Sequence, residues 1–103
     1  MLPGGTGKSV QISDSQVGKK LPDHASDYGL PMSKDGANAY KTITQNVLTN
    51  ASTVRTGTWK TLGQCDFYIY GNDVAIVQNG QWVSTFPMSN TGTIDYINSL
   101  PIK

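Results

Sequence analysis

The part of the chain from residue 53 to residue 86 alternates apolar and polar residues with a period of two, and it is interrupted only by short turn sequences. The interruptions are Gly63, Gly71-Asn72 and Asn79-Gly80. Asn79-Gly80 is the strongest indication of a β-hairpin, because both residues accept the positive φ of a type I′ turn. Short runs joined by tight turns predict a four-stranded antiparallel meander. The predicted strands are Thr53–Lys60, Cys65–Tyr70, Asp73–Gln78 and Gln81–Phe86.

Helical patterns lie on both sides of these strands. Ser33 is predicted to cap a helix that ends near residues 50–52, because apolar residues recur in it at steps of three and four. Pro22 and Gly29 are predicted to bound a short helix over residues 22–28, and Thr91–Leu100 is predicted to form a last short helix. The sequence therefore predicts an α+β fold in which N-terminal helices pack on one face of a twisted four-stranded antiparallel sheet.

The length of 103 residues fits one small domain, which we place at residues 19–103. Residues 1–18 are rich in Gly and Ser and are predicted to be a flexible lead-in or linker remnant, in which Val10 and Ile12 could dock as a short edge strand. The segment Gly4–Ser9 imitates a phosphate-binding loop, but Leu2 stands where the first glycine is needed. No apolar run is long enough to predict a membrane segment.

The charge distribution and the cysteine content limit the kinds of binding and metal sites that the chain can form. The net charge is only +1, yet residues 1–60 hold seven Lys or Arg against four Asp, whereas residues 61–103 hold one against three. A phosphate-binding surface would therefore come from the first part of the chain. The single cysteine, Cys65, excludes an internal disulfide, and its place in an apolar run predicts a buried structural thiol. One histidine and scattered aspartates have no metal-ligand spacing, so we predict no metal and no cofactor.

The only histidine, His24, follows the pair Lys19-Lys20 and lies between Asp23 and Asp27. Histidine is the side chain that most readily exchanges protons near neutral pH, and neighbouring lysines could hold a phosphate. Each residue also has an ordinary structural interpretation. A lone histidine is often a satisfied surface or core residue, and a lysine pair is usually just solvated.

Four motifs occur in order along residues 19–86: Lys19-Lys20, His24-Ala-Ser-Asp-Tyr-Gly-Leu30, Arg55-x-Gly-x-Trp59, and the hairpin sequence Phe67–Ile76. This pattern resembles the colicin D-like ribonucleases, which include the C-terminal toxin domains of contact-dependent growth inhibition proteins. The resemblance implies the fold shared by barnase, the colicin tRNases and RelE-type toxins. It also implies an endoribonuclease that cuts RNA, usually a tRNA, without a metal.

The resemblance implies that His24 is catalytic, that Lys20 assists it, and that Ser84 and Phe86 complete the site from the last strand. The chemistry of RNA cleavage suggests further residues. Phosphate charge would be neutralised by cations, bases would stack on aromatic rings, and hydroxyl groups would hold a phosphate oxygen or the 2′-OH. The additional candidates are Lys19, Lys41, Arg55 and Lys60 as cations, Trp59 and Tyr28 as rings beside Phe86, and Thr85 as a hydroxyl beside Ser84. Arg55 could instead form a structural ion pair, and Trp59 could belong to the core.

The expected function is a tRNA-cleaving toxin that uses 2′-OH attack and acts in the cytoplasm of a competing bacterium. It would be delivered as the C-terminal tip of a larger secreted or cell-surface toxin. A cognate immunity protein would block the active site, and a host factor in the target cell is a further partner that the sequence leaves open. The alternative is a non-catalytic RNA-binding or protein-interaction module in which His24 has no chemical role.

Overall fold

A computed structural model describes residues 10–103 of the chain, and its sheet is the predicted meander. The four strands are antiparallel and lie in the order β1-β2-β3-β4. Asn79 and Gly80 have φ values of 52° and 78°, as a type I′ turn requires. The strands are β1 (Thr53–Thr58), β2 (Gln64–Tyr70), β3 (Asp73–Gln78) and β4 (Gln81–Pro87).

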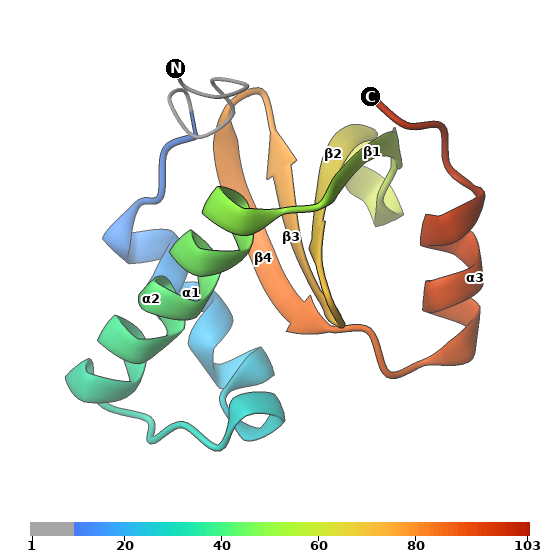
Figure 1. Cartoon of the computed structure of the whole chain (residues 1–103). Helices are drawn as coiled ribbons and strands as arrows, with labels where there is room; N and C mark the ends of the chain where they lie inside the picture. The colour runs from blue at the N-terminus through green and yellow to red at the C-terminus, as the bar shows by residue number, and fades with distance from the viewer. Residues whose placement is uncertain (1–9) are drawn as a thin grey trace.

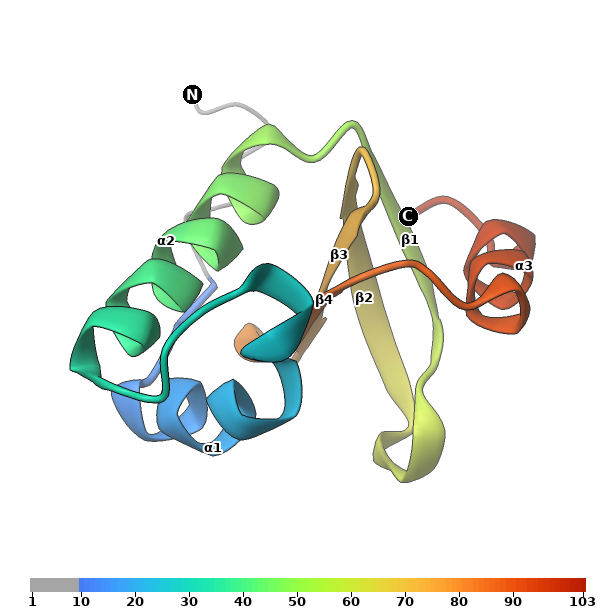
Figure 2. The same cartoon turned by 90° about the horizontal axis from the view of Figure 1, so that it is seen from below.

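Helices cover both faces of this sheet. The helices α1 (Asp14–His24) and α2 (Lys34–Asn50) lie together on one side, and α3 (Thr91–Ser99) lies on the other (Figures 1 and 2). Within residues 10–103, two short 3₁₀ turns accompany these elements, η3 (Ser26–Tyr28) after α1 and η4 (Lys60–Leu62) between β1 and β2. The predicted α+β class, with N-terminal helices on a four-stranded antiparallel sheet, is confirmed.

The helix α2 is the predicted one. Ser33 caps it by accepting a hydrogen bond from the Gly36 amide, and its buried residues lie on the face that packs on the sheet. The segment before α2 packs closely against the helix at Gly36. A Cβ at this position would lie 1.7 Å from the carbonyl oxygen of Pro31, so the turn before α2 can approach the helix only because residue 36 is glycine.

The helix α1 begins earlier than predicted. Ser13 caps it by accepting a hydrogen bond from the Gln16 amide at 3.1 Å, and Val17 and Leu21 are buried. Pro22 lies inside its last turn, where it deprives Gly18 of a hydrogen-bond donor. The α-helix ends at His24 and the 3₁₀ turn η3 follows it, so the predicted helix over 22–28 is divided between two elements. Gly29 ends η3 in the left-handed region, at the predicted stop. Residues 14–18 are also helical, where the sequence predicted a flexible lead-in.

Residues 10–13 lead into α1 along the outer edge of β4. Gln11 forms a bridge with Gln81, and its backbone bonds to Gly80 and Trp82. This is the position that an edge strand at Val10 and Ile12 would take, although only a single bridge forms. The rest of the predicted lead-in, including the Gly4–Ser9 segment, lies outside the described residues.

The two faces of the sheet carry separate cores. The first core lies under α1 and α2 and includes Val17, Tyr40 and Trp82. The second lies toward α3 and includes Phe67, Ile76 and Ile97. Cys65 is buried in the second core, as predicted, and burial raises the pKa of its thiol.

Candidate active site

A bulge in β4 sets the direction of the side chains near its end. Val77 pairs with Trp82, but the neighbouring residue Ile76 pairs with Ser84, so Val83 is an extra residue in the strand. Val83 packs against the second core, and Ser84 faces the same side because it pairs with Ile76 of that core. Bulges commonly redirect a side chain beside a functional site. Here the bulge leaves Ser84 on the same side of β4 as Val83. On that side its hydroxyl meets His24, at the end of α1.

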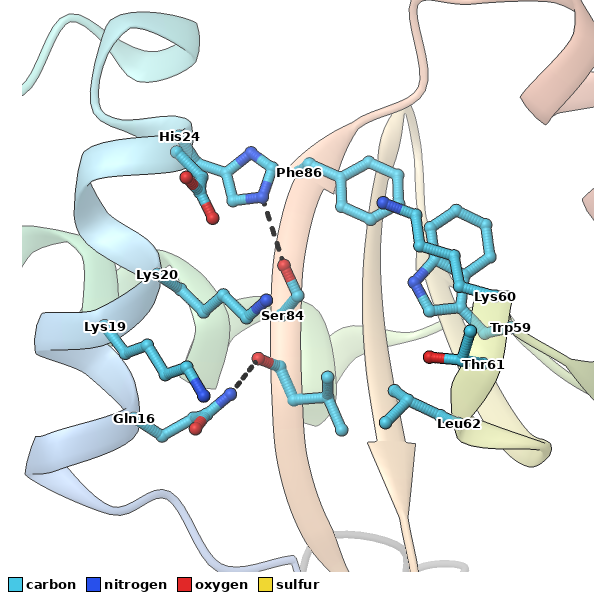
Figure 3. A pocket seen from close by; sticks show the side chains of 12 residues that line it. Gln16, Lys19, Lys20, His24, Trp59, Lys60, Thr61, Leu62, Ser84 and Phe86 are labelled. Atoms are coloured by element: carbon cyan, nitrogen blue, oxygen red, sulfur yellow. Dashed lines mark hydrogen bonds between the residues drawn. The ribbon is translucent and has the colours of Figure 1, made fainter.

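One face of α1 lies against this part of β4. Gln16, Lys20 and His24 follow one another at steps of four, so they form a single row along the helix. Gln16 Nε2 donates to the Val83 carbonyl oxygen at 2.8 Å and thereby fixes the helix to the bulge. Figure 3 shows Lys20 between Gln16 and His24, pointing toward Ser84.

His24 is held at both ring nitrogens. Its Nδ1 lies 2.9 Å from Asp27 Oδ2, and its Nε2 lies 3.1 Å from Ser84 Oγ. An ionised carboxylate only accepts hydrogen bonds, so Nδ1 carries a proton and donates the hydrogen bond to Asp27. In the neutral ring, Nε2 then has a free lone pair and accepts from the Ser84 hydroxyl. This is the nitrogen that lies beside β4 and the pocket.

The residue Tyr28 ties the Asp27 turn to the sheet. Its hydroxyl donates to Asp73 Oδ1 at 2.8 Å, at the start of β3. Burial, followed by this hydrogen bond, raises the pKa of Tyr28, so the hydroxyl remains a proton donor. Tyr28 therefore fixes the turn that carries Asp27, and it does not line the pocket at His24.

A cavity of about 400 Å³ opens in front of His24 and Ser84. Its walls come from α1, from β4 and from the segment Trp59–Leu62 between β1 and β2. Three lysines line it, Lys19, Lys20 and Lys60, against one aspartate, Asp23. The cavity is therefore a cationic pocket with an imidazole and a hydroxyl at its inner wall (Figure 3).

Aromatic rings continue from the imidazole across the pocket. Phe86 stacks on His24 with ring centroids 5.5 Å apart, and Trp59 stacks on Phe86 at 5.6 Å. The ammonium group of Lys60 lies 5.2 Å from the centre of the Trp59 ring. Trp59 also packs edge-on against Phe67 of the second core. Trp59 thus belongs both to the core and to the pocket, the two interpretations that the sequence left open.

The structure brings most of the predicted site residues together. Those that line the pocket are Lys19, Lys20, His24, Trp59, Lys60, Ser84 and Phe86.

Thr85, predicted to be catalytic, instead lies in a buried polar network on the opposite face of β4. Its hydroxyl bonds to Thr44 and to the indole of Trp82, both at 2.8 Å. The Tyr40 hydroxyl donates to the Thr85 carbonyl at 2.6 Å and accepts from the Thr85 amide at 3.1 Å. Thr85 has no exposed surface, so its position corrects the prediction and indicates a structural role.

Lys41 and Arg55, two predicted RNA-binding cations, do not line this pocket. Lys41 on α2 pairs with Asp14 at 3.2 Å. Arg55 on β1 donates to the Leu100 carbonyl at 2.6 Å and so holds the C-terminal segment against the strand. The charge of these residues suggested a phosphate contact, but the fold uses both side chains elsewhere.

Two contributors to the site were not assigned from the sequence. Gln16 was missed, although Ser13-x-x-Gln16 is a capping-box pattern that marks the true start of α1. Tyr40 lies on the buried face of α2, and its hydroxyl joins α2 to β4 one residue after Ser84. The sequence places Asp27 three residues after His24, and the fold brings its carboxylate to the imidazole.

No family model and no curated protein matches this chain significantly. Within residues 10–103, no helix is both long and apolar enough to span a membrane. In the same part of the chain, no three His, Cys, Asp or Glu side chains gather as metal ligands.

Proposed function

We propose that this protein is an endoribonuclease in which His24 transfers protons during attack of a ribose 2′-OH on the neighbouring phosphate. The observation that carries the proposal is the arrangement of one pocket. An imidazole oriented by Asp27 and a hydroxyl on Ser84 lie beside three lysines. Lysines favour a phosphate as the bound group, and the imidazole supplies the proton acceptor that metal-free RNA cleavage needs.

The proposed reaction begins with RNA that places a ribose 2′-OH at His24 Nε2. The nitrogen takes the hydroxyl proton while the 2′-oxygen forms a bond to phosphorus. The bond between phosphorus and the 5′-oxygen of the next nucleotide then breaks, and that oxygen takes up a proton from a solvent water. The imidazolium afterwards gives the 2′-OH proton to the hydroxide that this leaves, so the protons balance. The products are a 2′,3′-cyclic phosphate and a 5′-hydroxyl. Asp27 would stabilise the imidazolium that forms, because the carboxylate remains bonded to Nδ1.

The other pocket residues support the same reaction. Lys20 is the cation one helical turn before His24, on the same face, and we assign it to the charge that builds on the phosphate. The Ser84 hydroxyl occupies the hydrogen-bonding position of Nε2 in the free protein. On binding, it would pass this position to the 2′-OH and bond to a phosphate oxygen. Trp59 and Phe86 are half-buried aromatic residues of the pocket wall, and such rings suit contact with an unpaired base, which favours a single-stranded or looped RNA.

The salt dependence of RNA binding distinguishes the pocket from the rest of the basic surface. Lys20→Ala is expected to lower the slope of log K against log salt concentration by about 0.7 to 0.9, the value for one lost phosphate contact. Lys41→Ala removes the same charge from a position paired with Asp14, and it should leave the slope unchanged. Fluorescence anisotropy with a labelled RNA at several salt concentrations measures both. Equal slopes for Lys20→Ala and the unmutated protein would place the phosphate outside this pocket.

The order Asp27–His24–Ser84 also supports a second candidate, a hydrolase in which Ser84 is the nucleophile and His24 is its base. Ser84 is only 4% exposed and sits within a strand, and the lysines beside it favour a phosphate diester over a neutral acyl group. The ribonuclease is therefore the stronger proposal. A substrate that lacks the 2′-OH separates the two, since only the ribonuclease reaction requires that group.

The biological role that we propose is that of a tRNA-cleaving toxin acting in the cytoplasm of a competing bacterium. The support for this role is the ordered resemblance of residues 19–86 to colicin D-like ribonucleases, together with the clustering of its His, Lys and Ser positions in one pocket. An immunity protein with an acidic surface would fit the cationic pocket.

Incubation of the purified protein with total bacterial RNA tests the proposed function. We expect a discrete tRNA species to be cut. A non-catalytic binding module would shift RNA in a gel without cutting it.

A further inference from the structure

A second cavity adjoins the candidate active site. It has a volume of about 440 Å³ and lies between the end of β1 and the start of α3. Trp59 and Lys60 line both cavities, so a single indole and the lysine beside it separate the second cavity from the pocket at His24. The lining is largely apolar, and Tyr96 forms its wall on α3. We call this cavity the α3 groove.

The backbone between the two cavities adopts an unusual conformation. Lys60 has a φ of 50°, which places a non-glycine residue in the left-handed region. Residues held in this region tend to occur at functional sites, because the surrounding fold must offset their conformational cost. At Lys60 the result is an exposed ammonium group held near the Trp59 ring, at the boundary between the pocket and the α3 groove.

The Tyr96 ring is exposed but fixed. Its side is packed edge-on toward Phe67, and its hydroxyl bonds to both the backbone and the hydroxyl of Thr58. Tyr96 as a whole nevertheless keeps 36% of its surface exposed. An aromatic ring that is already ordered loses little side-chain entropy when a flat ligand stacks on it. The start of α3 is capped by Asn90, whose side chain accepts a hydrogen bond from the Thr93 amide at 3.1 Å.

We infer that the α3 groove binds the base of a second nucleotide, one position along the RNA from the nucleotide whose 2′-OH lies at His24. Lys60 would hold the phosphate that joins the two nucleotides, and the second base would lie between Trp59 and Tyr96. The inference rests on the proposed ribonuclease function and adds to it a specificity subsite. It predicts that substrates are selected at a base beyond the cleaved linkage.

The experiment uses oligodeoxynucleotides of about eight nucleotides that contain a single ribose, so that 2′-OH attack is possible at only one linkage and the register is known. An abasic residue replaces each other nucleotide in turn, and kcat/KM is measured. At one position next to the ribose-containing nucleotide, the abasic replacement should lower kcat/KM by about fivefold to thirtyfold. The loss should come chiefly from a higher KM, as expected when a stacked base is removed. The abasic series needs no protein variant and so does not depend on how a variant folds.

A double-mutant cycle then assigns this effect to the groove. In Tyr96→Leu, the abasic substitution at the sensitive position should cost less activity than in the unmutated protein, because one of the two rings that contact the base is already missing. Tyr70→Leu is the matched control, since Tyr70 is also an exposed aromatic residue, 41% exposed, but lies outside both cavities. It should keep the full abasic effect. Additive effects in Tyr96→Leu, or no sensitive position beside the ribose, would overturn the inference.

Failure of the ribonuclease proposal can be distinguished from failure of the proposed base subsite. If neither RNA nor the single-ribose substrate is cut, the ribonuclease proposal fails. The same cycle is then measured as dissociation constants by anisotropy, where coupling between Tyr96 and one abasic position still supports a base in the groove, and additivity excludes it.

Discussion

Replacing His24 by alanine is expected to lower the rate of RNA cleavage by about a hundredfold to ten-thousandfold, the usual contribution of a positioned acid or base. The imidazole presents Nε2 to the pocket in a fixed orientation, because its Nδ1 donates a hydrogen bond to Asp27. Without it, no imidazole is left to accept the 2′-OH proton, and Asp23 is the remaining carboxylate of the pocket. Single-turnover cleavage of a defined RNA measures the loss.

The fold should survive this substitution. His24 lies at the end of α1 and is 20% exposed, and the adjoining buried residues, Leu21 and Ala25, are untouched. The midpoint of thermal unfolding and the RNA dissociation constant serve as controls, and both should stay close to those of the unmutated protein. A folded His24→Ala protein that still cuts RNA at a near-normal rate would refute the mechanism. Lys20 and Ser84 would then become the candidates.

Replacing Tyr40 by phenylalanine is expected to lower the free energy of unfolding by about 2 kcal/mol, because one hydroxyl bonds to two buried backbone groups of Thr85. Phenylalanine keeps the ring but leaves the Thr85 carbonyl and amide without this partner. Burial raises the pKa of Tyr40 to about 12, so the hydroxyl remains protonated at neutral pH and can donate. For a domain of this size, the midpoint of thermal unfolding should fall by about 10 °C.

Tyr70→Phe is the matched control for this effect, since its exposed hydroxyl should change stability by less than about 0.5 kcal/mol. The rate of RNA cleavage provides a second measurement. Thr85 follows Ser84 directly, so a less ordered Thr85 backbone should change the orientation of the Ser84 hydroxyl and lower the rate. An unchanged free energy of unfolding in Tyr40→Phe would show that the Thr85 groups find other partners. The bulge would then not depend on α2.

The sheet could be predicted from the sequence because its turns have strong local signals. Asn79-Gly80 accepts positive φ at both positions, and the flanking runs are long enough to pair. The start of α1 could not be predicted in the same way. Gly18 and Pro22 both disfavour a helix, and the burial of Val17 and Leu21 against the sheet outweighs them. That gain depends on tertiary packing, which a local pattern does not reveal.

The site was predictable to a similar extent. The resemblance singled out His24, Lys20, Ser84 and Phe86, and the fold places them in one pocket. The placement of Thr85 depends on the bulge at Val83, and an alternating strand pattern cannot show where an extra residue is inserted.

The contacts between residues far apart in the sequence could not be predicted either. The partner of Arg55 is a carbonyl group 45 residues away in the chain, and Gln16 meets the strand 67 residues away. Charge and local spacing identify which side chains can contact phosphate, but only the fold decides which of them face it.

The most direct test of the central claim is the chemistry of the cut ends. Purified protein is incubated with tRNA in excess chelator, and the products are compared with those of a substrate that carries a 2′-deoxy sugar at the cleaved nucleotide. The proposed mechanism predicts 2′,3′-cyclic phosphate and 5′-hydroxyl ends, and no cleavage of the 2′-deoxy substrate. Products with a 3′-hydroxyl and a 5′-phosphate, or equal cleavage of the 2′-deoxy substrate, would contradict it.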